Sequence, residues 1–187
     1  MLKWFMKRKV KAFGDAFDYD TSYMRDLIDI DPAAGLAVSR LSAAASYRGD
    51  APVAAWFAGK LVAGMSEDCG PCVQLGVRMA ERAGVSASDL RAIIAGEVGR
   101  MSAEASLGYR FAKALLARSE ELDDLREEIV ARWGRKALGA ISIGIVTTRT
   151  FPAMKYALGH GHACVSVDIG GYVIAAHKPA RSETAYA

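Results

Sequence analysis

Residues 52–84 read PVAAWFAGKLVAGMSEDCGPCVQLGVRMAERAG. Pro52 is well suited to the start of a helix, and the apolar run after it indicates a buried helix. A Cys-Gly-Pro-Cys motif, from Cys69 to Cys72, then opens a second helix, which we expect to end at Gly84. The segment therefore predicts two helices joined at a close pair of cysteines.

Outside this segment, apolar spacing and capping residues predict further helices. Their expected ranges are Pro32–Ala44, Ser86–Ile94, Ser102–Arg118, Glu120–Trp133, Ala137–Val146 and Phe151–Gly159. Two alternating runs around Gly170-Gly171 predict a hairpin. We therefore expect an all-α helical bundle with a short C-terminal β-hairpin. A thioredoxin fold is not expected, because a strand would then precede the cysteine pair.

Length and composition are those of one folded domain. The chain has 187 residues, of which 52% are hydrophobic and 24% charged, as is typical of a globular protein with a core. We expect one domain over residues 1–187, with an N-terminal arm at 1–20 and a flexible tail at 179–187. The net charge of +3 gives no electrostatic case for nucleic acid binding, which needs a clustered basic face.

The distribution of charges predicts a cytoplasmic protein without a membrane span. The longest uncharged stretch, Ala137–Thr148, is shorter than the ~20 apolar residues that a spanning helix needs. Lysines interrupt residues 1–11, so this segment lacks the apolar core of an export signal. The basic segment either packs on the domain or on a neighbouring subunit, which we favour, or lies on an anionic membrane surface.

The pair Cys69 and Cys72 is the strongest functional signal. In a reducing cytosol a close cysteine pair is more often catalytic or metal-binding than structural. Free N–H groups and the helix dipole stabilise a thiolate at a helix N-terminus. The i, i+3 spacing places both sulfurs on one helix face, so one thiolate can attack a substrate while the other resolves the product. Because it lies at the edge of the helix, Cys69 is expected to be the more exposed of the two.

Two acidic residues, Glu67 and Asp68, directly precede the pair. A carboxylate near a helix start can cap the helix, repel a thiolate, or take its proton as a general base. We expect Asp68 to cap the helix and Glu67 to handle the proton.

A zinc site is the main alternative to redox chemistry. His160, His162 and Cys164 offer further ligands, and with Cys69 and Cys72 they would complete a site of three cysteines and one histidine. This alternative describes a non-catalytic helical oligomer with a zinc-binding or redox-sensing site. The plainer interpretations are two buried structural thiols, two histidines at a helix C-terminus and a packed strand cysteine.

The runs MSEDCGPCVQL at 65–75 and AERAGVS at 80–86 resemble the carboxymuconolactone decarboxylase/alkylhydroperoxidase D superfamily. In that family an apolar helix leads into a Cys-x-x-Cys pair, and a capped helix follows the next glycine. The resemblance, which covers residues 52–97, implies an all-α fold assembled into homo-oligomers. It also implies that Cys72 attacks a hydroperoxide or disulfide and that Cys69 resolves the product. A thiol donor would supply the electrons without a cofactor.

Two positions depart from that family's pattern. Its peroxidases carry a glutamate twelve residues before the first cysteine and a histidine one turn after the second, where this chain has Phe57 and Gly76. The proton relay must therefore be rebuilt, from Glu67 or from a distant histidine. The sequence predicts a thiol-dependent oxidoreductase that reduces alkyl hydroperoxides or disulfides through Cys69 and Cys72. Lactone decarboxylation is not expected, because that branch of the family lacks the pair.

Overall fold

The computed structural model describes residues 1–162 and 166–176, and it confirms the all-α fold class with a short hairpin. The helices in this part of the chain are α1 (Leu2–Phe17), α2 (Ser22–Ile30), α3 (Pro32–Ala45), α4 (Val53–Ser66), α5 (Gly70–Arg82), α6 (Ala87–Ala95), α7 (Ala103–Ala117) and α8 (Leu122–Ala157). A short 3-10 helix, Val98–Arg100, links α6 to α7, and the strands are β1 (Ser166–Ile169) and β2 (Tyr172–Ala175).

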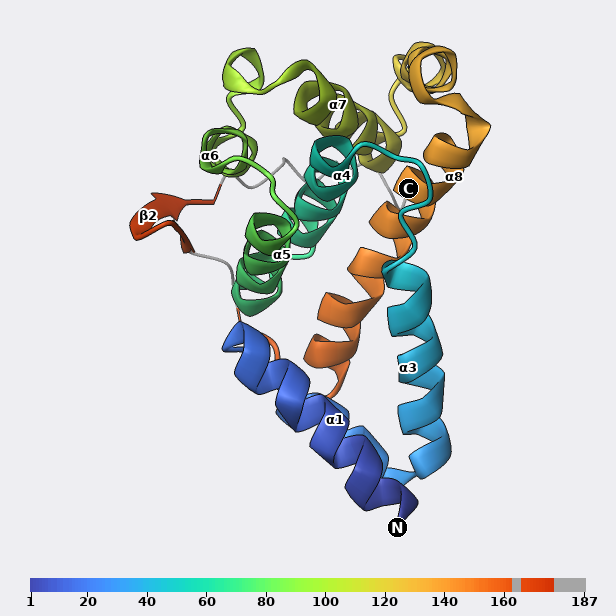
Figure 1. Ribbon diagram of the computed structural model, residues 1–187, viewed down its shortest axis with the longest axis vertical. Helices are drawn as coiled ribbons and strands as arrows, with labels where there is room; N and C mark the ends of the chain where they lie inside the picture. Colours follow the sequence, from blue (N-terminus) through green and yellow to red (C-terminus); the bar gives the residue numbers. More distant parts are fainter. Residues whose placement is uncertain (163–165, 177–187) are drawn as a thin grey trace, which may run out of the picture.

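Helix α4 is the most buried helix of the molecule, and α5, α7 and α8 pack around it (Figure 1). Its alanines and glycines let these neighbours approach closely. Gly108 of α7 lies against the α4 backbone, where an added Cβ would be 2.7 Å from the Cα of Ala55. Gly59 faces the Ile145 side chain of α8, where an added Cβ would be 3.1 Å from Cγ1. Small residues at the crossings therefore set the tight packing of the centre.

The capping residues predicted from the sequence form their expected bonds. Ser86 Oγ accepts the N–H of Asp89 at 3.0 Å, and Ser102 Oγ accepts the N–H of Ala105 at 3.3 Å. The Asp89 carboxylate in turn accepts the N–H of Ser102 at 2.6 Å. These bonds tie the start of α7 to α6, and each cap of this kind contributes about 1 kcal/mol.

Helix α8 differs from the prediction in its C-terminal part. The break predicted at Gly134 is present, since this residue has φ 82° and ψ 168°. The separate helix predicted from residue 151 is wrong, because α8 runs on through Pro152 to Ala157. Pro152 and Lys155 are both buried, so packing holds the helix on either side of the proline. This packing outweighs the loss of one backbone N–H.

Continuity through Pro152 also lengthens the apolar part of α8. Among the described residues, α8 is the one helix long and apolar enough to cross a membrane by length and composition. Core helices of soluble proteins pass the same test, so one such helix is weak evidence for a span. Here α8 packs on α3, α4 and α7.

Helices α1, α2 and α3, residues 2–45, form an arm that extends from the core of α4 to α8 (Figure 1). In the view, α1 and α3 converge near the N-terminus and diverge toward the core, where α1 contacts α5 and α3 contacts α8. The sequence predicts an arm only at 1–20 and gives no indication of α2. The aromatics Phe13 and Phe17 pack together at 5.2 Å, whereas Trp4 and Phe5 are exposed on this chain.

The predicted hairpin is confirmed. Strands β1 and β2 pair in antiparallel register, with Ile169 opposite Tyr172. Gly170 and Gly171 both have positive φ, 59° and 82°, as a type I′ turn requires. Buried Ile169 and Val167 face α5 and α6. The expected tail at 179–187 and the strand cysteine lie outside the described residues.

Candidate functional site

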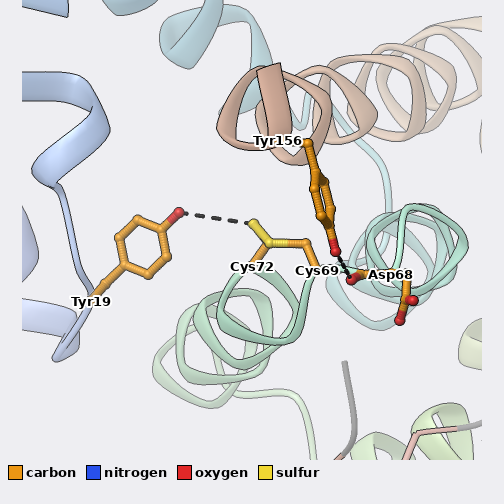
Figure 2. The surroundings of a disulfide bond; sticks show 5 residues. All are labelled: Tyr19, Asp68, Cys69, Cys72 and Tyr156. Atoms are coloured by element: carbon orange, nitrogen blue, oxygen red, sulfur yellow. Dashed lines mark hydrogen bonds between the residues drawn. A yellow bond between two sulfur atoms is a disulfide. The ribbon is translucent and has the colours of Figure 1, made fainter. Parts of the chain in front are cut away.

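The cysteine pair lies at the start of α5, as predicted. Cys69 is the N-cap residue and Cys72 is in the first turn. Their sulfurs are joined in a disulfide, with the Cα atoms 5.3 Å apart (Figure 2). This separation is ordinary for a disulfide. The Cys69 carbonyl accepts the N–H groups of Cys72 and Val73 at 3.1 and 3.0 Å, which closes the turn that brings the sulfurs together.

The turn before the pair is anchored to the C-terminal part of the chain. Asp68 has a left-handed φ of 54°, and its carbonyl accepts a hydrogen bond from the Tyr156 hydroxyl at 2.8 Å (Figure 2). Gly70 N–H donates to the His162 carbonyl at 3.2 Å. The sequence predicts that Asp68 caps α5, but Cys69 occupies the N-cap position. These bonds fix the direction in which the pair faces.

The two cysteines differ in exposure. Cys69 is fully buried, at 0% exposed, whereas Cys72 is half-buried and lines a cavity. The expectation that Cys69 would be the more exposed thiol is therefore wrong. Cys72 lies on the side of α5 that faces the arm, where the Tyr19 hydroxyl approaches its sulfur.

The cavity beside Cys72 has a volume of about 300 Å³ and lies between the arm and the core. Arm helices α1, α2 and α3 form one wall, and residues of α4, α5 and α8 form the other. Most of the lining is apolar, including Val10, Phe13, Ile28, Val38, Leu75 and Met79. Cys72 thus opens on an apolar chamber of the size that small ligands use.

Tyr19, in the connection between α1 and α2, brings a polar side chain of the arm to the cysteine pair. Its hydroxyl lies 3.9 Å from Cys72 Sγ (Figure 2). Burial raises the pKa of Tyr19 to about 12, so the hydroxyl keeps its proton near neutral pH. The backbone N–H of Tyr19 bonds to the Gly14 carbonyl at 2.9 Å. Tyr19 is therefore a fixed, protonated donor beside the sulfur that faces the cavity.

A buried lysine lies behind Tyr19. Lys155 is 1% exposed, and its ammonium lies 4.8 Å from the ring centroid of Tyr19 and 5.4 Å from that of Tyr23. Burial lowers the pKa of Lys155, and the nearby charge of Asp20 partly opposes this. Burial also raises the pKa of Tyr23. The arm therefore contributes two protonated tyrosines, which pack against the Lys155 side chain of α8.

Glu67, the predicted proton-handling residue, forms an ion pair with Arg149 of α8. Its carboxylate accepts from Arg149 Nε at 2.5 Å. Among the described residues no hydrogen bond joins Glu67 to either sulfur. A role for Glu67 in proton transfer stays a prediction.

Apolar packing occupies the two positions where the resembling family carries its relay. Phe57 is buried against Trp56, with ring centroids 4.8 Å apart. A Cβ at Gly76 would lie 3.0 Å from the Cδ2 of Leu61. These positions therefore provide neither the acid nor the imidazole of that relay.

The residues of the zinc alternative are only partly described. His160 bonds through Nδ1 to Ser22 Oγ at 3.1 Å and through Nε2 to Asp26 Oδ2 at 2.9 Å. His162 is exposed, and Cys164 lies outside the described residues. In residues 1–162 and 166–176, no group of three or more His, Cys, Asp or Glu side chains could hold a metal ion.

Sequence reasoning missed Tyr19, Lys60 and Lys155. Lys60 and Lys155 carry a signal, because each is a lone cation in an otherwise uncharged run of its helix. Such a lysine must find a buried partner or a cavity. No local pattern identifies Tyr19, which reaches Cys72 only because the arm folds back over α5.

Comparisons with known proteins give no relative of this chain. No protein family model matches it, and neither a curated protein nor a solved structure does. The resemblance to the carboxymuconolactone decarboxylase/alkylhydroperoxidase D superfamily therefore stays a prediction, as do the homo-oligomer and the cytoplasmic location.

Proposed function

We propose that this protein is a thiol-dependent oxidoreductase that reduces alkyl hydroperoxides or disulfides through Cys69 and Cys72. The observation that carries the proposal is the different exposure of the two cysteines. One sulfur opens on an apolar cavity, and the other is buried directly behind it at disulfide distance. An accessible thiol that attacks and a shielded thiol that resolves need this arrangement.

With a hydroperoxide, the Cys72 thiolate attacks the distal oxygen. An S–O bond forms, the O–O bond breaks, and the alcohol leaves after taking up a proton. The Cys69 thiol then attacks the Cys72 sulfur, so that the disulfide forms and water leaves. A thiol donor returns the disulfide to two thiols and is itself oxidised.

With a disulfide substrate, Cys72 forms a mixed disulfide and releases the first thiol. Cys69 then resolves the mixed disulfide and releases the second.

Tyr19 supports the first step in this proposal. Its hydroxyl is 3.9 Å from Cys72 Sγ, and a protonated phenol donates to a thiolate or to a developing alkoxide. Because its pKa is raised to about 12, Tyr19 holds its proton until an alkoxide forms. This residue, rather than an acid on α4, would supply the proton that the leaving alcohol needs.

Turnover of cumene hydroperoxide with a dithiol donor tests the proposal. We expect Cys72→Ser to reduce turnover to the uncatalysed background. Cys69→Ser should lower turnover strongly, because the Cys72 sulfenic acid must then be resolved by the donor thiol instead of by Cys69. Cys164→Ser is the matched control, because the proposed reaction does not use this third cysteine, and it should retain full turnover. Unchanged turnover in both variants of the pair would remove the proposal.

A further inference from the structure

Lys60 is a charged residue in the otherwise uncharged helix α4, and it lines the same cavity as Cys72. Its ammonium donates to the Ala45 carbonyl at 2.8 Å and lies 4.0 Å from the ring centroid of Trp56. The lysine stem therefore runs along α4 while the charged end reaches the wall that α3 forms.

No acid neutralises this cation in the part of the chain that the structure describes. Lys60 takes part in none of the ion pairs found there. An ammonium has three donors, and the Ala45 carbonyl is the one hydrogen-bond acceptor that it reaches among these residues. Burial lowers the pKa of Lys60 to about 8, so the group is still mostly charged at pH 7. Buried charges are normally paired, which leaves Lys60 ready for an anion.

Among the described residues, the remaining cavity lining contains no carboxylate. Its other ionisable side chains are Lys9, Tyr19 and Tyr23, and Lys9 lies on the exposed side of α1. Three hydroxyls of the lining donate to backbone carbonyls four residues earlier in the chain: Ser42 to Val38, Ser46 to Ser42 and Thr148 to Gly144. In the part of the chain that the structure describes, the chamber is thus an apolar space lined by cations and by no acidic residue.

We propose that the cavity binds a carboxylic acid with an unbranched alkyl chain, whose carboxylate pairs with Lys60 and whose chain lies among the apolar residues beside Cys72. The inference rests on the proposed function and deepens it, because it makes hydroperoxides of carboxylate-bearing alkyl chains the substrate class. A methylene group is about as large as a water molecule, which takes about 30 Å³. A cavity of about 300 Å³ therefore suits a chain of roughly ten carbons.

Binding of decanoate and of decan-1-ol to the full-length protein, measured by calorimetry at pH 7, tests the inference. The two ligands share the chain and differ in the charged head. We expect decanoate to bind about tenfold or more tightly than the alcohol, as a charge-assisted bond in a partly buried site provides.

Lys60→Met should remove that advantage and leave decan-1-ol affinity unchanged. Lys9→Met is the matched control, since it removes the other cation of the lining and should retain most of the preference for decanoate. Unchanged binding of the alcohol also shows that the variant keeps the cavity. If Lys60→Met does not fold, Lys60→Gln serves the same purpose with a polar side chain.

Equal affinities of the two ligands for the unmodified protein would overturn the inference. An equal loss of affinity for decanoate and for decan-1-ol in Lys60→Met would also overturn the inference. Binding is measured with the disulfide intact and without peroxide, so it does not depend on turnover. Cysteine-dependent turnover without a preference for decanoate would contradict this inference and leave the proposed function standing. A preference for decanoate without turnover would contradict the proposed function, and with it the hydroperoxide substrate class, while the carboxylate site would stand.

Discussion

The core and the arm bury their residues to very different degrees. Helix α4 in the core buries eleven of its 14 residues, whereas α3 in the arm, also with 14 residues, buries only Ala45. Small residues hold the core by close backbone contact. Side-chain bonds hold the arm, among them those from Arg78 to the carbonyls of Phe17 and Asp18. The core therefore fixes where the sulfurs lie, and the arm determines what surrounds them.

The functional residues therefore come from both regions, the core and the arm. The core places Cys72 and Lys60 on one side of the cavity. The arm closes the other side and brings Tyr19 to Cys72. Changes in the core should accordingly affect folding, and changes in the arm should affect the reaction.

The largest expected effect is on the free energy of unfolding, when a glycine of the core and a glycine of the arm are each replaced by alanine. Gly108→Ala would force a methyl group into the Ala55 backbone, and we expect the free energy of unfolding to fall by about 2 kcal/mol or more. At Gly35 in α3, the added Cβ would lie 2.7 Å from the Cγ1 of Ile28 and from the terminal methyl of Met6. No backbone atom lies as close as at Gly108 and the Met6 methyl can move aside, so we expect a smaller loss, of about 1 kcal/mol.

Urea unfolding measures both effects. Gly139→Ala is the control, because nothing lies within 4 Å of its added Cβ, and it reports the gain in helix propensity alone. Equal losses at Gly108 and Gly35 would contradict the distinction between core and arm.

A second comparison sets Tyr19 of the arm against Glu67 of the core. Tyr19→Phe removes the donor 3.9 Å from Cys72 Sγ, so we expect oxidation of Cys72 by hydroperoxide to slow about tenfold or more. Glu67→Gln should change the rate by less than about twofold, because its carboxylate is paired with Arg149.

The rate of oxidation is measured in the Cys69→Ser background, where no disulfide can form in the pair. Without the Tyr19 hydroxyl the thiolate loses a hydrogen bond, so the deficit should grow as the pH falls. A larger loss in Glu67→Gln than in Tyr19→Phe would assign proton handling to the core, as the sequence predicts.

The smallest expected effect is the pH dependence that Lys60 contributes to stability. Burial lowers its pKa to about 8 in the folded protein, against about 10.4 in an unfolded chain. Between these values the unfolded state binds more protons, so the free energy of unfolding rises with pH. Below about pH 8 the lysine is charged in both states and its burial cost is present in full.

We therefore expect the stability of the unmodified protein to increase from pH 7 to pH 9 relative to that of Lys60→Met, measured by urea unfolding. Other titrating groups are common to both proteins and cancel in the difference. A difference that stays constant or reverses over this range would show that Lys60 is not buried as described.

Sequence reasoning predicts the core well and the arm poorly, for physical reasons. Pro52, Ser86 and Ser102 begin helices through local chemistry, and apolar spacing marks the faces that become buried. The hairpin follows from Gly170-Gly171, since only glycine adopts two consecutive positive φ values easily. These signals act over a few residues and can be read without the fold.

Three features of the site depend on contacts that are distant along the chain. Tyr19 reaches Cys72 across 53 positions. Cys69 is buried rather than exposed, because its surroundings, and not its place at the helix edge, determine its accessibility. Pro152 stays inside α8, because packing on both sides outweighs the local preference for a break.

The orientation of the cysteine pair is the claim on which the proposed chemistry depends, and one experiment tests it directly. Reduced Cys69→Ser and Cys72→Ser are each treated with one equivalent of an alkyl hydroperoxide and a reagent that traps sulfenic acids, and are then analysed by mass spectrometry. If Cys72 faces the cavity and attacks, Cys72 is labelled in the Cys69→Ser variant, and Cys69 stays unlabelled in the Cys72→Ser variant. Labelling of Cys69 in Cys72→Ser, with none at Cys72 in the other variant, would contradict it.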